Sequence, residues 1–142
     1  MKNTIKKNLM LPVFITIVSI NTSWSHDVGN QASTFIVSPQ NEARVTSPIN
    51  IKFGIKNFKI APAGKNIHEA GHYHLLIDLD SELSMNEPIP NDEKHQHFDS
   101  GETEVLLSLR PGKHTLQLVV GDEEHEPFEQ LISKKVIIEV IE

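Results

Sequence analysis

Hydrophobic and polar residues alternate along several short stretches of this chain. In residues 50–58, NIKFGIKNF, the apolar side chains of Ile51, Phe53 and Ile55 fall on one face and lysines fall on the other. A period of two is typical of a β-strand with one buried face. Comparable runs, bounded by turn residues, are 33–38, 72–78, 103–109, 114–122 and 134–142, and a shorter one lies within 38–48.

These runs and their spacing predict an all-β fold. About seven short strands with turn signals between them, and no long helical pattern, are typical of an antiparallel β-sandwich, and we expect an immunoglobulin-like topology. The strongest turn signal is RPGK at 110–113, where proline fixes φ and glycine supplies a positive φ. We therefore predict a hairpin that pairs 103–109 with 114–122. His114 would then lie at the edge of the apolar face as a structural residue.

The first 25 residues predict a cleaved signal peptide. Three lysines precede an apolar run at 9–20 that is short for a membrane span and suits a signal sequence, although an N-terminal membrane anchor is the alternative. Small residues at 23 and 25 predict cleavage before His26 and a periplasmic or secreted protein. The expected organisation is a signal peptide at 1–25, a short segment at 26–33 and one β-sandwich domain at 34–142.

Composition narrows the chemistry of the expected mature chain. Residues 26–142 hold 10 basic and 19 acidic side chains, a formal charge of −9, which disfavours nucleic acid and anionic membrane surfaces as partners. The chain has no cysteine, and Met85 is the only methionine after residue 25, so thiolate sites and methionine-rich copper(I) sites are excluded. Zinc or copper(II), bound by imidazole and carboxylate, fits the remaining side chains.

Clustered histidines are the strongest sign of function in the sequence. Four of the eight form two H-x-H pairs, His72/His74 and His95/His97. On a strand, both members of a pair point to the same side, roughly 6.5–7 Å apart along the chain. That spacing allows both imidazoles to bind one ion at about 2.0–2.1 Å per bond. Tyr73 and its apolar neighbours would then face the core.

A long connection, residues 80–101, carries the second pair and is able to fold over the first. The predicted antiparallel arrangement brings the segment before Thr103 and the segment after Val120 to the same end of the sandwich. The predicted metal ligands are His72, His74, His95, His97 and His125. Neighbouring carboxylates would be solvated or would orient an imidazole.

Three motifs resemble those of a bacterial family of small exported domains with no assigned function. The resemblance covers roughly residues 34–141, and its motifs are GHYHLLID at 71–78, PIPNDEKHQHFDSGETE at 88–104 and LRPGKHTLQLVVGDEEHEPF at 109–128. It implies an immunoglobulin-like sandwich in the cell envelope, and it matches the family's histidines to His72, His74, His95, His97, His114 and His125. The chain departs from the family pattern at Tyr73, Glu102 and Phe128, where the family has His, Gln and His, but keeps both H-x-H pairs.

The expected function is therefore that of a periplasmic, non-catalytic protein that binds zinc or copper(II). One variant places copper(II) at the new amino terminus, because a mature chain that begins at His26 offers an amine and an imidazole on one residue. Small exported copper carriers with an immunoglobulin-like fold are similar in this respect.

Two alternatives stay open. The first is a structural or protein-binding module of the envelope, with no metal, in which the histidines form hydrogen bonds that hold the long connection. The second is a metal-dependent enzyme similar to cupins, although Asp78 stands where a cupin has glutamate. No nucleophile elbow is present in the chain. The letters HEAGH at 68–72 match H-E-x-x-H, but they fall where a predicted loop meets a predicted strand, whereas the zinc-protease motif needs a helix.

Overall fold

The computed structural model describes residues 31–64 and 70–142. Within these residues the chain forms strands and no helix, so none of the described segments is a helix able to cross a bilayer. The predicted signal peptide, His26 and His68 lie outside the described residues. The strands are β1 (Ser33–Ser38), β2 (Ala43–Thr46), β3 (Ile49–Lys56), β4 (Lys59–Ile60), β5 (Ala70–Ile77), β6 (His95–Phe98), β7 (Glu104–Leu107), β8 (Gly112–Gly121), β9 (Pro127–Ile132) and β10 (Val136–Ile141).

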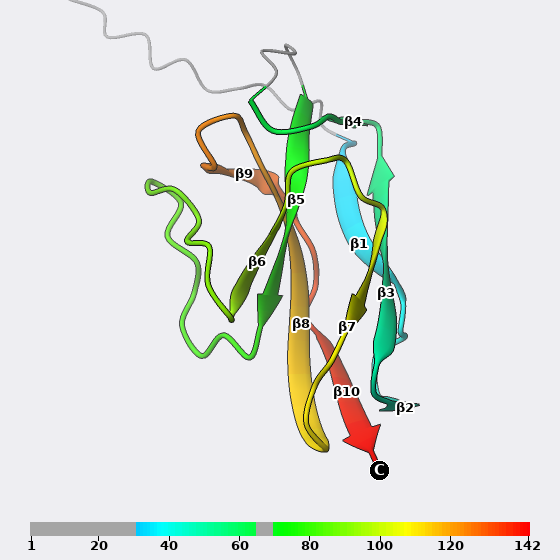
Figure 1. The fold of residues 1–142 in the computed structure, drawn as a ribbon. Helices are drawn as coiled ribbons and strands as arrows, with labels where there is room; N and C mark the ends of the chain where they lie inside the picture. Colours follow the sequence, from blue (N-terminus) through cyan, green and yellow to red (C-terminus); the bar gives the residue numbers. More distant parts are fainter. Residues whose placement is uncertain (1–30, 65–69) are drawn as a thin grey trace, which may run out of the picture.

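The strands form two sheets that face each other as a sandwich (Figure 1), which confirms the predicted all-β class. The smaller sheet has the order β1-β3-β7. The larger has the order β2-β10-β8-β5-β4, and in addition β6 pairs with β5 and β9 pairs with β8. Most neighbours are antiparallel, whereas β2 runs parallel to β10 and β4 runs parallel to β5. The alternating runs all form strands, and the sequence pattern missed the short β4, β6 and β9.

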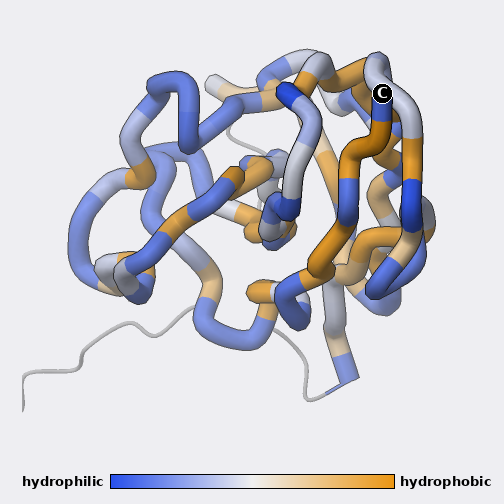
Figure 2. Tube along the Cα trace, turned by 90° about the horizontal axis from the view of Figure 1, so that it is seen from below, coloured by the Kyte–Doolittle hydropathy of each residue, from blue (hydrophilic) through white to orange (hydrophobic). Residues whose placement is uncertain are grey.

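The main core lies between the sheets. Tyr73, Leu75 and Ile77 of β5 face it, as the alternation predicted, and Leu116 and Leu118 of β8 lie beside them. These five side chains are almost fully buried, and each such burial stabilises the fold by roughly 1.5–3 kcal/mol. Figure 2 shows hydrophobic positions concentrated along the strands, whereas the loops are mostly hydrophilic.

The predicted hairpin between 103–109 and 114–122 is not formed. β7 pairs with β3 in the smaller sheet, whereas β8 pairs with β5, β9 and β10 in the larger one. Residues 108–111 therefore cross between the sheets. Both strands do point their apolar faces into the core, but from opposite sides of it, and alternation alone does not distinguish this arrangement from a hairpin.

A second, smaller apolar layer covers the outer face of the larger sheet. The connection between β5 and β6 folds back over this face, and its Ile89 packs against Leu76 of β5 and Val119 of β8. Both faces of β5 are consequently buried, and the strand is buried along nearly its whole length. Leu76 lies on the same face of β5 as His72 and His74, so these histidines share the outer face with this layer.

Candidate metal centre

Histidines from three segments meet on the outer face of β5. His72 and His74 alternate with the core residues of β5, so their side chains point away from the core, and they are only 1% and 0% exposed. β6 lies antiparallel to β5 with His97 directly opposite His74. His125 comes from the turn between β8 and β9. The register of β5 with β6 thus fixes the first three rings.

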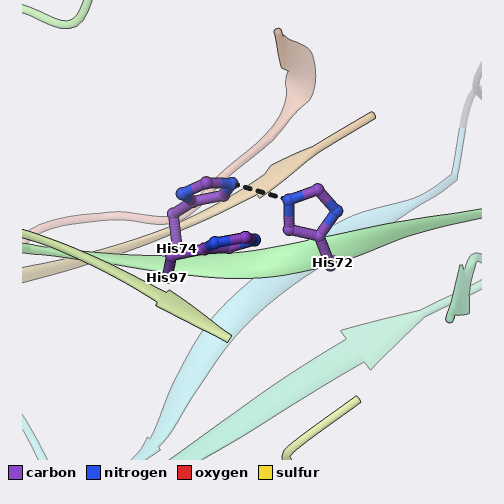
Figure 3. A group of neighbouring side chains, drawn as sticks. All are labelled: His72, His74 and His97. Carbon is purple, nitrogen blue, oxygen red and sulfur yellow. Dashed lines mark hydrogen bonds between the residues drawn. The ribbon is translucent and has the colours of Figure 1, made fainter. Parts of the chain in front are cut away.

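The ring nitrogens of His72, His74 and His97 point toward one another (Figure 3). One nitrogen from each lies within 4.8 Å of the others, and this group of three is one that a metal ion could join. Nε2 of His72 lies 3.0 Å from Nε2 of His74, so one of these nitrogens donates to the other. The rings of His74 and His97 are stacked, with centroids 4.8 Å apart and planes 11° from parallel.

His125 covers this group of three. Its ring centroid lies 4.8 Å from that of His72, 5.7 Å from that of His74 and 4.6 Å from that of His97, with the planes nearly perpendicular. The turn that carries it is held by Asp122, whose Oδ1 accepts the N–H groups of Glu124 and Glu126 at 3.0 and 2.9 Å.

Two of the buried nitrogens lack a conventional partner. Nδ1 of His74 and Nε2 of His97 form no hydrogen bond with any described residue. A buried polar atom without a partner costs about 1–3 kcal/mol. A ligand that accepts a nitrogen lone pair would account for Nε2 of His97. The ring of His74 faces His72 through its Nε2, so a metal bound at that nitrogen leaves Nδ1 without a partner.

The buried imidazoles are neutral at neutral pH. Burial, and then the neighbouring His97 and His125, lower the pKa of His72 to about 4. Burial and the surrounding imidazoles lower the pKa of His74 to about 2. Burial and then His125 also lower the pKa of His97, against the opposing effect of Asp99 and Glu102. A neutral imidazole keeps the lone pair that binds a metal.

Gly121 and Gly71 form a wall of the site that the sequence analysis missed. A Cβ atom on Gly121 would lie 3.0 Å from Nε2 of His74, so the glycine leaves room for this ring. A Cβ atom on Gly71 would lie 2.5 Å from the carbonyl oxygen of Gly121, so that glycine permits the close approach of β5 and β8. The available signal was a glycine directly before the first H-x-H pair, Gly71, and a glycine inside the predicted strand 114–122, Gly121.

The remaining two histidines of the family motifs have other partners. His95 shares a face of β6 with His97, but its Nδ1 donates to Oδ1 of Asp92 at 2.8 Å, and it stands outside the group of three. His114 lies at the other end of β5, where its Nδ1 donates to Asp78 at 2.7 Å and its Nε2 to the Arg110 carbonyl at 2.8 Å. Of the five predicted ligands, the structure brings together His72, His74 and His97, with the ring of His125 above them.

The sequence was also compared with known families and proteins. The model of the family described as "Domain of unknown function (DUF4399)" matches residues 51–141, which is more than half of the chain. The chain belongs to this family. No curated protein and no solved structure matches it. Membership in DUF4399 agrees with the resemblance to a family of unassigned function, and the function must be argued from the site itself.

Proposed function

We propose that this DUF4399 protein is an exported, non-catalytic protein that binds one zinc or copper(II) ion through His72, His74 and His97. The single observation that carries the proposal is the convergence of three imidazole nitrogens within 4.8 Å of one another, on buried rings of which His97 has an Nε2 without a partner among the described residues. Imidazole is a preferred ligand of both ions.

The spacing of the three nitrogens is close to that of metal ligands, but the nitrogens of His72 and His74 must separate slightly and His97 must approach. Ligands at about 2.0–2.1 Å from a tetrahedral ion stand about 3.3 Å from one another. The nitrogens of His72 and His74 are already 3.0 Å apart, and all three fit within 4.8 Å. Side-chain rotations on fixed strands are enough to close the difference. Three imidazoles leave one further position on a tetrahedral ion.

The charges around the site also favour a cation. The carboxylates of Asp99 and Glu102 lie close enough to influence His97 electrostatically, and Asp99 also influences His72. Carboxylates around a histidine site orient the rings and raise their affinity for metal. Because the rings themselves are neutral, an incoming dication meets no imidazolium charge from His72, His74 or His97.

Burial favours binding over catalysis. His72 and His74 are 1% and 0% exposed, so a substrate has little access to an ion held between them. The apolar run at 9–20 and the small residues before His26 support export to the periplasm. The proposed partner is therefore the metal ion, with an envelope protein as the source or recipient.

One observation favours a second function, that of a metal-free structural module. The rings of the cluster pack on one another, and the carbonyl of His125 accepts the N–H of Ile89 from the long connection at 2.9 Å. In this alternative the histidines hold the outer layer on the sheet, and their loss lowers stability without changing any metal affinity.

A matched pair of variants tests the proposal. His97 and His95 lie on the same face of β6, two residues apart, and both are half-buried. Residues 26–142, purified without a histidine tag, are titrated with zinc and copper(II) as wild type, His97→Ala and His95→Ala. We expect one tight equivalent in the wild type and in His95→Ala, and an affinity at least roughly 100-fold lower in His97→Ala, which loses a direct ligand.

Equal zinc affinity in all three proteins would reject the metal site and favour the structural module. Copper(II) that binds all three proteins equally, while zinc binds none, would instead favour chelation by a mature amino terminus at His26. Circular dichroism of each variant shows whether His97→Ala remains folded.

A further inference from the structure

His125 differs from the other three cluster histidines in how the chain holds it. His72, His74 and His97 stand on β5 and β6, and β5 is hydrogen-bonded along both edges, to β6 and to β8. His125 stands instead on a short turn, residues 122–126, between β8 and β9. Three rings are thus held by strand ladders, whereas the ring of His125 is held by a turn and stands outside the group of three whose nitrogens converge.

The backbone at His125 is strained. Its φ is 68°, in the left-handed region that non-glycine residues seldom adopt. Its N–H donates to the Asp122 carbonyl at 3.1 Å, and its carbonyl accepts from Ile89 at 2.9 Å. Strain of this kind persists only where surrounding contacts enforce it, and it is common at functional sites. Here the enforced conformation places the ring over the other three imidazoles.

His125 is one of the two partly exposed rings of the cluster. His72 and His74 are fully buried, whereas His97 and His125 are half-buried. The ladder between β5 and β6 fixes His97 opposite His74. His125 is therefore the partly exposed ring that no strand holds.

We propose that His125 is an exchangeable fourth ligand that closes over the metal ion and gives way to a donor from a metal acceptor. This inference rests on the metal site proposed above. In the exchange, a lone pair on the incoming nitrogen or oxygen forms a bond to the ion as the bond from His125 breaks, with no electron transfer. The acceptor's donor is of the imidazole or carboxylate class, since these bind the same ions.

Replacement of His125 by glycine tests this role with little risk to the fold. Glycine tolerates a φ of 68°, so His125→Gly removes the ring and the strain together. Zinc and cobalt(II) are titrated into wild type, His125→Gly and the control His95→Ala, with cobalt(II) absorption as a report of coordination. Release is timed after addition of excess EDTA. Free imidazole is then added as a substitute for the missing ring.

We expect His125→Gly to keep one equivalent of metal on the remaining three histidines, with an affinity lower by roughly tenfold or more and a faster release. Free imidazole should restore the wild-type cobalt(II) spectrum and slow the release, and His95→Ala should behave as wild type. Equal affinity and release in wild type and His125→Gly would overturn this proposal and leave the three-histidine site standing. Complete loss of metal in His125→Gly would also overturn it, because the ligand would then be essential.

If the wild type binds neither zinc nor cobalt(II), the metal site itself is rejected. That result is distinct from the two outcomes above, which concern only the role of His125.

Asp122→Ala gives a second measurement, since it removes the carboxylate that holds the turn and keeps the ring of His125. It should speed metal release while it lowers affinity less than His125→Gly does.

Discussion

Two histidine environments lie at opposite ends of β5 and have opposite protonation. Near the start of the strand, His72 and His74 are buried among other imidazoles, and their pKa values are lowered. Just after its end, Asp78 faces His114. Burial alone would lower the pKa of His114, but hydrogen bonds to Asp78 and to the Arg110 carbonyl outweigh it, and the pKa is raised. His74 and Asp78 are four residues apart, which corresponds to about 13 Å along an extended chain at about 3.3 Å per residue.

The difference follows from the number of acceptors around each ring. Both nitrogens of His114 meet an acceptor, at 2.7 and 2.8 Å, so both donate and the ring carries a positive charge. In the cluster, Nδ1 of His74 and Nε2 of His97 meet no acceptor among the described residues, so these rings stay neutral. The charged ring has no lone pair for a metal and serves as a structural tie, whereas the neutral rings keep theirs.

The largest expected effect is that of acid, which protonates His72 and His74 and so removes the difference in charge between the two sites. A histidine whose folded pKa is lowered does not affect stability above pH 6.5, and it costs about 1.4 kcal/mol for each pH unit below that until its folded pKa is reached. For His72 the loss continues to about pH 4, and for His74 to about pH 2. Between pH 6.5 and 4.5 each ring should therefore lower the free energy of unfolding of the metal-free protein by about 3 kcal/mol.

Urea denaturation at pH 7 and pH 4.5 measures this loss, and His74→Leu serves as the comparison. The leucine variant should lose about 3 kcal/mol less than the wild type over the same interval, because the ring of His74 no longer titrates. An identical loss in both proteins would mean that His74 is not neutral and buried.

A methyl group at Gly121 should disturb the histidine cluster and leave the site of His114 unchanged, so it tests the two sites separately. In Gly121→Ala the added Cβ would lie 3.0 Å from Nε2 of His74 and must push the ring aside, while His114 is untouched. We expect zinc affinity to fall by roughly tenfold, about 1.4 kcal/mol, since ligand positions tolerate little displacement. Isothermal titration with zinc measures the change. Unchanged affinity together with an intact fold would show that the ring of His74 does not contribute.

The smallest effect is expected at the charged pair. A raised pKa means that His114 stabilises the fold fully below pH 6.5 and that this contribution disappears as pH rises through its folded pKa. The Asp78 side chain is 39% exposed, so solvent screens the pair. His114→Ala should cost about 1 kcal/mol at pH 6 and less at pH 9, with no change in zinc affinity. Weaker zinc binding in this variant would contradict the separation of the two sites.

The sequence predicted the parts of the structure that depend on local alternation. The alternating period assigned the main strands and placed Tyr73, Leu75 and Ile77 on the core face, with His72 and His74 on the other. The predicted hairpin also brought the segments before Thr103 and after Val120 to one end. The hairpin itself is wrong, because β7 pairs with β3 and β8 with β5. The short connection at 108–111 nevertheless keeps those segments at one end, and the rings of His97 and His125 lie close together, with centroids 4.6 Å apart.

What the sequence did not predict depends on long-range pairing. β6 has only four residues, HQHF, which carry no clear apolar alternation, and its register with β5 decides that His97 meets His74. The turn signal at 110–113 is local, whereas the choice between a hairpin and a crossing is made by the pairing of β7 with β3. His72 and His74 pack against His97 of β6 and His125 of the β8–β9 turn, and a residue-by-residue pattern does not reveal these long-range contacts.

Nitrogen NMR of the histidine rings tests the central claim most directly, because it reports the protonation and ligation of each imidazole in one spectrum. At pH 7, without metal, the account predicts neutral rings at His72, His74 and His97 and two protonated nitrogens at His114. One equivalent of zinc should shift the ring nitrogens of His72, His74 and His97 and leave those of His114 and His95 unchanged. Unshifted signals from His72, His74 and His97, or shifts confined to His95 or His114, would contradict the account.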